Sequence, residues 1–600
     1  MKIKVAKYIA DFMVKNGVNH VFTITGGGAM HLNDAFGHQE GLKCTYNHHE
    51  QACSIAAEAY ARLTNKLALV CVTSGPGGTN AITGVLGGWL DSIPMFIISG
   101  QVKRETTLWS TDVPLRQLGD QEYNIVASVA PMTKYACMIT EPNDIKYHLE
   151  KALYLALNGR GGPVWLDIPL DVQAAIVETD ELRGFDVEEV SNENPIYDKS
   201  ITPKILEKIK QSKRPVILAG SGIRLGKAYN QFIKLIDKLQ IPVVTAWNAH
   251  DVLWDEHPLF CGRPGTVGTR GGNFVVENSD LLLVLGCRLN IRQISYNYND
   301  YAKNAYKIII DIDENELKKP TIKADLPIWA NVRDVIDDVL LYDYALGNEM
   351  HKRWLKWCKN INKKYPAVLP KYYEKSSPVN PYAFINELFN ELEEGDNVIT
   401  GNGSACVITF QAAKIKKRQR LFTNSGCAAM GYGFPAAIGA SIGLNGKRVI
   451  CIDGDGSFQM NIQELQTVVY NNLNIKIIYL NNNGYHSIRQ TQNNLFDPPL
   501  IGVCDGNGLS FPDMKKIAWA YGITYIKIDN IDESRKLIRN MLDSDGPMIC
   551  EVIIDPSQNF EPKLSSKILP NGKIVSPSID DMYPFLDRDE YDRNKNLDLI

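Results

Sequence analysis

The stretch that decides the fold runs from Val449 to Asn482 and reads VICIDGDGSFQMNIQELQTVVYNNLNIKIIYLNN. Its apolar start, Val449 to Ile452, predicts a buried strand that ends at the polar run Asp453-Gly454-Asp455-Gly456-Ser457. A segment with helical spacing of apolar residues follows, and a second apolar run over 475–480 leads into Asn481-Asn482. The stretch therefore predicts a β-α-β unit, the building block of a parallel sheet.

Two polar side chains of this unit, Asp455 and Asn482, each follow a predicted strand. Open α/β sheets bind ligands at the carboxyl ends of their strands. A carboxylate and an amide oxygen are hard donors, and beside the Gly454 and Gly456 amides they suit Mg²⁺ that also carries a phosphate. The alternative is an ordinary β-α turn with a capping aspartate. The flanking strand and helix, together with the Asn-Asn pair, favour the metal site.

Strand and helix patterns alternate along the rest of the chain, which predicts an α/β fold with mainly parallel, doubly wound sheets. A polar stretch over 178–194 and a charged helical stretch over 342–378 separate three such units. We therefore expect three domains and a surface tail, at residues 1–175, 195–345, 375–557 and 558–600.

The composition excludes several classes of protein. The 600 residues carry a formal net charge of −4 and are 44% hydrophobic, which gives no reason to expect nucleic acid as a partner. The twelve cysteines form no C-x-x-C pair, and neither a signal peptide nor an apolar run that could span a bilayer is found. We expect a cytoplasmic enzyme that does not bind membranes.

The Gly454-Asp455-Gly456 triplet followed by Asn481-Asn482 resembles the signature of the thiamine-diphosphate-dependent enzymes. The resemblance covers nearly the whole chain. The sequence is most similar to the acetolactate synthase branch, for which the stretches at 73–77 and 162–169 are typical. It implies a pyrimidine-binding domain, a central domain and a diphosphate-binding domain. It also implies that Asp455, Asn482 and the Gly484 carbonyl hold Mg²⁺ against thiamine diphosphate.

Thiamine chemistry needs an acid at the aminopyrimidine ring of the cofactor, and Glu50 is the candidate. It begins a predicted helix whose small apolar face excludes water, so its carboxyl group can share a proton with a nitrogen base. The alternative is a glutamate that merely favours the helix start. The neighbouring His49 is a candidate proton shuttle, although a packing role is an equal alternative. Glu58, which lies eight residues after Glu50 in the same predicted helix, is interpreted as one partner of a structural ion pair.

The resemblance also implies that further residues contact the cofactor. Met430 would be the apolar wedge that bends it, and the Ala428 carbonyl would accept a hydrogen bond from its 4′-amino group. The remaining candidates lie in loops that follow predicted strands: Gly401, Asn402, Gly403, Gly454, Gly456, Ser457, Tyr485, His486 and Ser487.

The substrate side departs from the acetolactate synthase pattern. Gln121 matches a substrate-facing glutamine of that branch, but Asp120 and Thr491 stand where those enzymes carry a phenylalanine and a tryptophan. Polar groups in place of large apolar ones widen the pocket, and His486, Arg489 and Gln490 add hydrogen-bonding groups. A polyhydroxylated or charged acceptor is therefore expected, as in the branched-chain sugar enzymes of this family.

The central unit raises the question of a flavin. Arg160, Gly220, Gly222, Gly286, Arg288, Arg292 and Asp311 correspond to FAD-contacting positions of acetolactate synthases. The paired aspartates that follow the Arg288 position in those enzymes read Asn290-Ile291 here. We expect FAD as a bound structural cofactor, not a hydride carrier.

The leading hypothesis is a carboligase that decarboxylates pyruvate and transfers the two-carbon unit to a carbonyl acceptor, such as a nucleotide-linked 4-keto-deoxysugar. The alternatives are an acetolactate synthase, a C–C hydrolase or decarboxylase of a dione or 2-keto acid, and a non-catalytic binding subunit. Because Glu50 and Asp455 lie in different domains, the resemblance implies that they meet across the interface of a homodimer or homotetramer.

Overall fold

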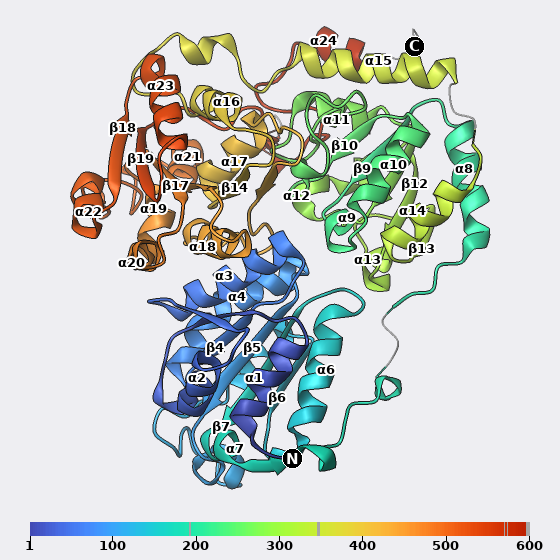
Figure 1. Ribbon diagram of the computed structural model, residues 1–600. Coiled ribbons are helices and arrows are strands. Elements are labelled where there is room, and N and C mark those ends of the chain that lie inside the picture. The colour runs from blue at the N-terminus through green and yellow to red at the C-terminus, as the bar shows by residue number, and fades with distance from the viewer. Residues whose placement is uncertain (191–193, 345–347, 569–570, 573, 596–600) are drawn as a thin grey trace.

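The computed structural model describes residues 1–190, 194–344, 348–568, 571–572 and 574–595. Three lobes are visible in Figure 1, one from each third of the chain, and each is built around its own parallel sheet. The sheets contain six, five and six strands, and helices cover both faces of each. The predicted α/β class with three mainly parallel sheets is therefore confirmed.

The N-terminal lobe has the strand order β3-β2-β4-β5-β7-β6. Its strands are β2 (His20–Thr23), β3 (Lys43–Tyr46), β4 (Leu69–Val72), β5 (Met95–Gln101), β6 (Tyr135–Met138) and β7 (Pro163–Pro169). Its helices are α1 (Val5–Lys15), α2 (Met30–Gly37), α3 (Glu50–Thr64), α4 (Pro76–Asp91), α5 (Ile125–Val129), α6 (Ile145–Leu157) and α7 (Leu170–Ala174). A short antiparallel pair, β1 (Lys2–Lys4) with β8 (Ile176–Glu178), joins the two ends of the lobe.

The central lobe has the order β10-β9-β11-β12-β13. Its strands are β9 (Pro215–Ala219), β10 (Val243–Thr245), β11 (Leu281–Leu285), β12 (Tyr306–Asp311) and β13 (Leu326–Trp329). Its helices are α8 (Thr202–Gln211), α9 (Gly222–Leu225), α10 (Tyr229–Leu239), α11 (Arg270–Glu277), α12 (Ile291–Ile294), α13 (Glu314–Lys318) and α14 (Val332–Leu341). The charged stretch predicted as a connector contains α15 (Glu349–Lys364), whose Trp354 and Cys358 are buried in the core of this lobe.

The C-terminal lobe has the order β15-β14-β16-β17-β19-β18. Its strands are β14 (Asn397–Thr400), β15 (Arg420–Phe422), β16 (Val449–Gly454), β17 (Ile475–Asn481), β18 (Thr524–Ile528) and β19 (Met548–Ile553). Its helices include α16 (Pro381–Glu391), α17 (Gly403–Ala412), α18 (Gly433–Gly443), α21 (His486–Leu495), α22 (Met514–Tyr521) and α23 (Ile531–Leu542). The predicted β-α-β unit is β16 and β17, which pair in parallel from Val449 with Ile475 to Gly454 with Leu480.

The segment between β16 and β17 is not the single helix that its spacing predicts. It divides into α19 (Asp455–Phe458), a 3₁₀ segment η12 (Gln459–Glu464) and α20 (Leu465–Tyr470). The break is at Asn461, whose φ of −132° is not helical. The Asn461 amide nitrogen donates hydrogen bonds to the Gly431 carbonyl (2.8 Å) and to Gln51 (3.0 Å), so groups distant in sequence hold the kink.

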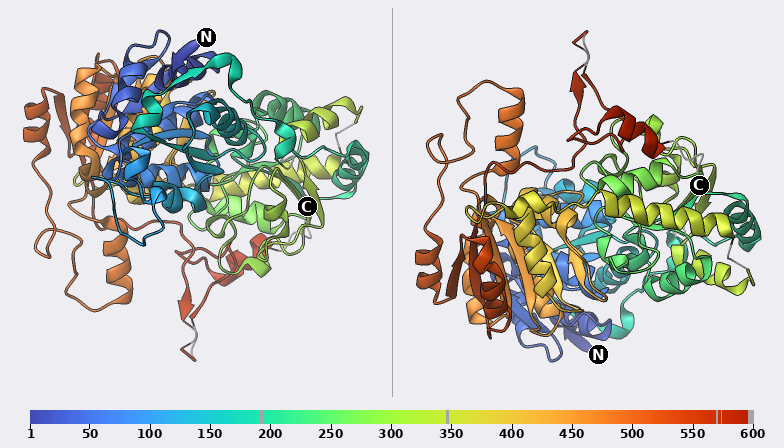
Figure 2. Two further views of the ribbon diagram at one scale, coloured as in Figure 1. Left: turned by 90° about the horizontal axis from the view of Figure 1, so that it is seen from below. Right: turned by 90° about the horizontal axis from the view of Figure 1, so that it is seen from above.

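After the last strand of the C-terminal lobe, the described part of the tail returns to the central lobe. Helix α24 (Arg588–Lys595) lies beside α15 and α11, where Lys364 contacts Glu590 and the Asn278 amide reaches the Asn594 carbonyl. Figure 2 shows α21 and the β20–β21 pair (Lys567–Ile568 with Ile574–Val575) projecting from the same side of the body. The domain boundaries stay a prediction, and positions 345 and 596–600 of that prediction lie outside the described residues.

Helix α3 joins the N-terminal lobe to the C-terminal lobe. It packs against α4 on one side and α18 on the other, and a glycine makes each approach possible. A Cβ atom at Gly84 of α4 would lie 2.7 Å from the Ile55 backbone nitrogen, and one at Gly439 of α18 would lie 1.9 Å from the Ala56 carbonyl oxygen. The three helices therefore touch backbone to backbone.

Two further observations concern the whole chain. None of the helices in the described ranges combines the length and the apolar composition that a membrane span requires. All twelve cysteines lie within those ranges, and each is a free thiol.

Candidate functional site

The candidate site lies where three neighbouring strands of the C-terminal lobe end. The loops after β14, β16 and β17 carry Gly401–Gly403, Asp455–Ser457 and Asn482–Ser487, and parallel pairing brings these loops to one edge of the sheet. A Cβ atom at Gly403 would lie 3.4 Å from Ser487 Oγ. The structure thus brings together the diphosphate and metal residues that the sequence predicts.

Asp455 and Asn482 are in direct contact at this edge. Asp455 Oδ2 accepts hydrogen bonds from the backbone N–H groups of Asn482 (3.1 Å) and Gly484 (3.0 Å), and Oδ1 accepts one from Gly456 (2.8 Å). Burial raises the pKa of the Asp455 carboxyl to about 6, although these N–H groups and Arg489 act in the opposite direction. The carboxylate is thus fixed beside the loop that carries Asn482.

The side chain of Asn482 supports the interpretation as a metal site. It is 5% exposed, and its Oδ1 has no hydrogen-bond partner within the described residues. A buried acceptor without a donor is costly, and a cation beside Asp455 would satisfy it. Within the same residues, no cluster of three His, Cys, Asp or Glu side chains offers a different metal centre. The residues present therefore fit the predicted set of Asp455, Asn482 and a backbone carbonyl.

The predicted wedge lies beside these loops. Ala428 has a φ of +53°, in the left-handed region, and its carbonyl accepts a hydrogen bond from Asn402 Nδ2 (2.7 Å). A Cβ atom at Gly456 would lie 2.3 Å from the Tyr485 ring and 3.4 Å from the Met430 methyl group, so only glycine fits between them. The backbone N–H of Gly431 donates to Ser457 Oγ (2.9 Å). The predicted wedge at Met430 and the turn Gly454-Asp455-Gly456, called the GDG loop below, therefore form one packed unit.

Residues of α21 differ from the expectation that they face an acceptor. His486 and Gln490 are buried, and the His486 ring bonds to Ser404 Oγ (2.7 Å) and to Gln490 Nε2 (2.9 Å). Burial lowers the pKa of His486 to about 4, which keeps it neutral near pH 7. Arg489 donates to the carbonyls of Asn482 (3.2 Å) and Asn483 (2.9 Å). Within this chain, these three side chains hold α21 and its loop, whereas Thr491 is exposed.

Glu50 is the first residue of α3, and its Oε2 accepts a hydrogen bond from Asn80 Nδ2 (3.0 Å) in the same lobe. His49 is the N-cap of the helix, because its Nδ1 accepts from the Gln51 N–H (3.0 Å). Capping the helix is a structural role for His49 and corresponds to the alternative to its predicted role as a proton shuttle.

The start of α3 also contacts the C-terminal lobe through a residue that the sequence does not single out. Glu464, which is fully buried, accepts hydrogen bonds from Asn47 Nδ2 (2.9 Å) and the His48 N–H (2.9 Å). Its position nine residues after Asp455 is the only sequence signal, and the two partners in the N-terminal lobe are more than 400 residues away. Glu464 therefore ties the loop that precedes Glu50 to the segment that follows Asp455.

Gln121 lies in a long segment, 102–124, with several exposed side chains. Its φ is +61°, and a Cβ atom at Gly75 would lie 2.4 Å from the Gln121 carbonyl oxygen, so the segment contacts the turn before α4. The Glu122 carboxylate accepts hydrogen bonds from the N–H groups of Leu118 (2.9 Å) and Gly119 (3.2 Å). The Gln121 side chain is exposed.

Gln101 and Asp167 close the base of that segment. The Gln101 side chain accepts from the Val102 N–H (3.0 Å) and donates to the Tyr123 carbonyl (2.9 Å) and to Asp167 (3.0 Å). Asp167 also accepts from Ser99 Oγ (2.6 Å) and is fully buried. Both ends of the Gln121 segment are thereby fixed to the sheet.

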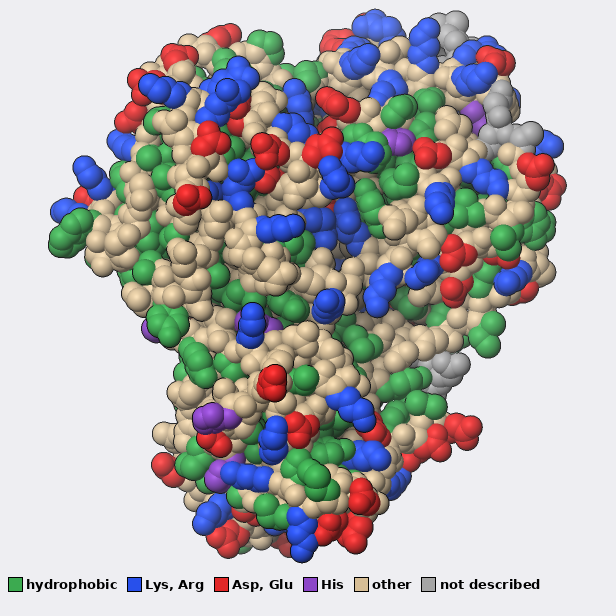
Figure 3. Space-filling model, viewed as in Figure 1, with side chains coloured by type: hydrophobic (Ala, Val, Ile, Leu, Met, Phe, Trp, Pro, Cys, Tyr) green, Lys and Arg blue, Asp and Glu red, His purple; other side chains and the backbone are tan. Residues whose placement is uncertain are grey.

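A cavity of about 480 Å³ lies at the junction of the lobes. It is lined by five of the predicted flavin residues: Arg160, Gly222, Gly286, Arg288 and Asp311. Gly220 and Arg292 are not in its lining: Gly220 packs against Gly286, and the Arg292 guanidinium lies 5.5 Å from the centre of the Trp247 ring. Figure 3 shows Lys and Arg side chains along the seam between the lobes. The cavity is large enough for a nucleotide-sized ligand.

Comparison with known proteins defines the class. The chain matches the thiamine pyrophosphate enzyme N-terminal TPP binding domain over residues 3–124, the central domain over 202–339 and the C-terminal TPP binding domain over 401–552. The protein therefore belongs to the thiamine pyrophosphate enzymes, whose two TPP-binding domains imply thiamine diphosphate as its cofactor.

Within that class, the chain is similar to acetolactate synthase large subunits. It is 32% identical to that of Cyanidium caldarium over 571 residues, which cover 93% of this chain and 94% of that protein. It is 32% identical to that of Lactococcus lactis subsp. lactis over 553 residues (91% and 92%) and 29% identical to the isozyme 1 large subunit of Escherichia coli K12 over 557 residues (93% and 95%). It is thus a thiamine-diphosphate-dependent enzyme of the acetolactate synthase-like family.

The buried Asp167 leads to a pH-dependence that can be measured. Burial raises the pKa of Asp167 to about 7, so the native state holds a proton that the unfolded chain has released above pH 4. Stability from this group is therefore lost as the pH rises toward 7, and Asp167→Asn should remove that loss. Between pH 5 and pH 8, the stability of the variant relative to wild type should improve by about 3 kcal/mol.

Denaturant unfolding at the two pH values measures this difference. Asp171→Asn is the control, because its bond to Arg104 lowers the pKa of a carboxyl that burial alone would raise, and it stays ionised throughout this range. The same stability difference for Asp167→Asn at both pH values would contradict the prediction.

Proposed function

We propose that the protein is a Mg²⁺- and thiamine-diphosphate-dependent carboligase that decarboxylates pyruvate and transfers the two-carbon unit to a carbonyl acceptor. Two observations beside the GDG loop carry the proposal: the Asp455 carboxylate accepts a hydrogen bond from the Asn482 N–H, and the buried Asn482 Oδ1 has no hydrogen-bond partner among the described residues. When bound, thiamine diphosphate supplies the nucleophilic carbon and the electron sink that decarboxylation of a 2-keto acid needs.

The chain's own residues would divide the remaining work. Asp455, Asn482 and the Gly484 carbonyl would hold the metal, and the loops at 401–403 and 454–457 would hold the diphosphate. Met430, which lies against the GDG loop at Gly456, would support the cofactor rings, and Glu50 would exchange a proton with the pyrimidine ring. Gln121 would face the substrate from its exposed segment. His49, which directly precedes Glu50 in the sequence, would be a second proton-transfer group.

The proposed acceptor is a polar carbonyl compound, such as a nucleotide-linked 4-keto-deoxysugar. Support comes from Asp120 and Thr491, which are exposed polar residues where the resemblance expects large apolar ones. Since His486 and Gln490 are bound to each other, polar contacts to the acceptor would come from the exposed side chains of these two segments. The second candidate is an acetolactate synthase, which uses a second pyruvate as acceptor and is the activity that the names of the relatives carry.

The proposed assembly is a homodimer or homotetramer in which Glu50 of one chain completes the diphosphate site of another. Large apolar side chains are exposed on the segment that carries Gln121, at the end of α21 and in the chain that follows it, including Trp109 (75%), Leu495 (69%) and Ile501 (75%). Exposed apolar groups in this number are typical of a surface that another chain covers.

We also propose that the cavity at the junction of the lobes binds FAD. The Asp311 carboxylate at the end of β12 suits a ribose hydroxyl, and the cavity is of nucleotide size. Arg160 is neutralised by Asp313 and Glu316 at 2.9 Å each, so it would contact such a ligand as part of an ion-paired cluster.

The first prediction of the proposed function tests the reaction. Purified protein with Mg²⁺, thiamine diphosphate and pyruvate should release CO₂, and a 4-keto-deoxysugar nucleotide should yield a product two carbons larger by mass spectrometry. Glu50→Gln should lower kcat by at least about a hundredfold while the cofactor still binds, because only proton transfer is removed. Turnover of pyruvate by Glu50→Gln at the wild-type rate would disprove the mechanism, and acetolactate as the sole product would favour the second candidate.

The second prediction tests the assembly by mixing two inactive variants, Glu50→Gln and Asp455→Ala. If each site combines Glu50 of one chain with Asp455 of another, the mixed dimer contains one intact site and activity returns after co-refolding or co-expression. If both groups act within one chain, neither site is intact and the mixture stays inactive. Light scattering of the wild type measures the number of chains.

The third prediction concerns the flavin. Purified protein should be yellow, and heat should release a flavin that is identified by its absorbance and mass. The signal should not depend on thiamine diphosphate, because the two proposed sites share no residue. A colourless protein that binds no added FAD would contradict the proposal.

A further inference from the structure

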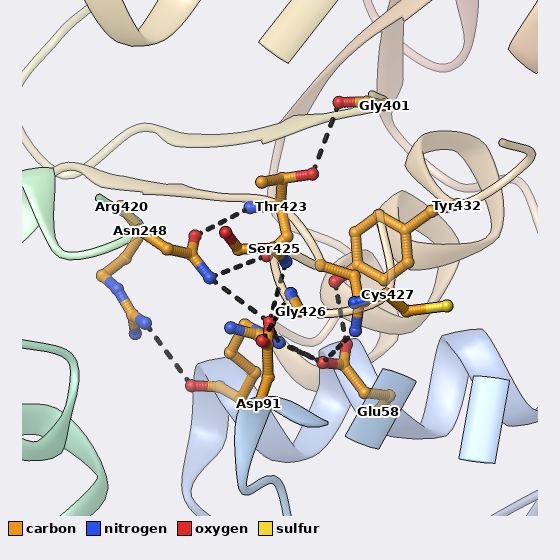
Figure 4. Close-up of polar contacts among 12 residues, drawn as sticks. Glu58, Asp91, Asn248, Gly401, Arg420, Thr423, Ser425, Gly426, Cys427 and Tyr432 are labelled. Atoms are coloured by element: carbon orange, nitrogen blue, oxygen red, sulfur yellow. Dashed lines mark hydrogen bonds and ion pairs between the residues drawn. The ribbon is translucent and has the colours of Figure 1, made fainter. Parts of the chain in front are cut away.

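The segment Thr423–Tyr432 connects β15 to α18 and lies where the three lobes meet (Figure 4). It carries Ala428 and Met430. Two of its residues have backbone angles in the left-handed region, Ala428 with a φ of +53° and Gly431 with a φ of +82°. Because Ala428 is not a glycine, its conformation costs free energy and persists only if the surroundings fix it.

One end of the segment is held by Asp91. Its Oδ2 accepts a hydrogen bond from the Ser425 N–H (2.9 Å), and its Oδ1 accepts one from the Gly426 N–H (2.8 Å). A Cβ atom at Gly426 would lie 2.6 Å from the Leu90 Cβ, so only glycine allows this approach. Asp91 is the last residue of α4, where the helix dipole disfavours a negative charge. An aspartate at this position therefore has a specific role outside its own helix.

The other end is held by Glu58 of α3. Its Oε2 accepts a hydrogen bond from the Tyr432 hydroxyl (2.8 Å), and its Oε1 accepts a longer one from Asn424 Nδ2 (3.4 Å). Asn424 in turn accepts, through its own Oδ1, from the Cys427 N–H (3.2 Å). Glu58 thus holds both the exit of the segment and the turn that leads to Ala428.

Arg62 lies between the two carboxylates. Its Nε donates to Glu58 (3.0 Å) and its Nη2 to Asp91 (2.7 Å), and all three side chains are at most 8% exposed. One guanidinium cannot neutralise two carboxylates, so the N–H and O–H groups of the segment complete their solvation. If the segment moved away, a buried carboxylate would lose its donors, which is strongly unfavourable.

The central lobe contributes a third contact. Asn248 accepts from the Thr423 N–H (3.1 Å) and donates to the Thr423 carbonyl (2.9 Å), and its Nδ2 also reaches Asp91 (3.4 Å). This segment of the C-terminal lobe is therefore held by residues of both other lobes.

We propose that Glu58 and Asp91, bridged by Arg62, are positioning residues that hold the Thr423–Tyr432 segment in the conformation that activates the cofactor. This inference rests on the proposed function, because Met430 and the Ala428 carbonyl act on thiamine diphosphate only in such an enzyme. The two carboxylates act through the segment: Asp91 binds its backbone at Ser425 and Gly426, and Glu58 binds the side chains of Asn424 and Tyr432.

The test uses Asp91→Asn. The asparagine keeps one acceptor oxygen but loses the charge that holds two N–H groups and Arg62. In the cofactor-free protein, hydrogen exchange followed by mass spectrometry should show backbone amides of residues 425–432 exchanging about tenfold faster, as expected for the loss of a charge-assisted bond. With Mg²⁺ and thiamine diphosphate, the Kd of the cofactor should change by less than about threefold, because Asp455 and Asn482 are intact.

The decisive readout is the rate at which bound thiamine diphosphate exchanges its C2 proton with solvent, which reports cofactor activation without substrate. Asp91→Asn should slow this exchange by about tenfold or more. Tyr432→Phe, which removes only the hydroxyl that donates to Glu58, is the milder variant and should show the same pattern to a smaller extent, so that the test stands if Asp91→Asn does not fold.

The matched control is Asp396→Asn. Asp396 is also a buried carboxylate in an arginine pair, with Arg448 at 2.8 Å and 2.9 Å, but it lies at the amino ends of β14 and β16, away from the segment. It should lower the melting temperature without changing C2 exchange. The inference is wrong if Asp91→Asn and Tyr432→Phe exchange C2 at the wild-type rate, or if Asp396→Asn slows it equally. If the wild-type protein shows no C2 exchange at all, the proposed function itself fails.

Discussion

The contact on which the structure depends is the backbone-to-backbone packing of α3 between α4 and α18. Gly84 and Gly439 have no side chains to separate the helices, so the axis of α3 is fixed against both lobes. Because the helices contact through backbone atoms, no flexible side chain can repack to accommodate a shift of α3. Any such shift would also move the start of the helix. The position of Glu50 relative to the C-terminal lobe is therefore set by glycines that contact α3 between one and two turns after Glu50.

Buried polar groups then fix the orientation that helix packing alone leaves free. Glu464 binds the loop before Glu50, while Arg62 and its two carboxylates bind the segment before α18. Burying such charges contributes little net stability, but breaking one contact leaves an unpaired group and is costly. The interface between the lobes thus has one favoured arrangement, in which the GDG loop, the wedge and α3 are joined by hydrogen bonds.

The sequence predicts the parts that depend on local pattern. The strands around Asp455 and Asn482 follow from apolar runs, and parallel pairing then brings their loops together. The kink at Asn461 could not be predicted, because Gly431 and Gln51 impose it from distant positions. In α21, helical spacing places His486 and Gln490 on one face, but only the tertiary structure shows that this face is buried. The same holds for Gly220 and Arg292, whose packing is decided by neighbouring loops.

The residues proposed to hold the cofactor and those proposed to face the substrate differ in burial, and this difference has a consequence for specificity. Asp455, Asn482 and the carboxylates around Arg62 are buried and held by several hydrogen bonds, so substitutions there disturb the fold. Asp120 and Thr491, where the chain departs from the acetolactate synthase pattern, are exposed on the 102–124 segment and on α21. Exposed segments on a rigid scaffold tolerate change at low cost in stability. If these two segments face the acceptor as proposed, a change of acceptor would require substitutions there and none in the sheets that carry Asp455 and Asn482.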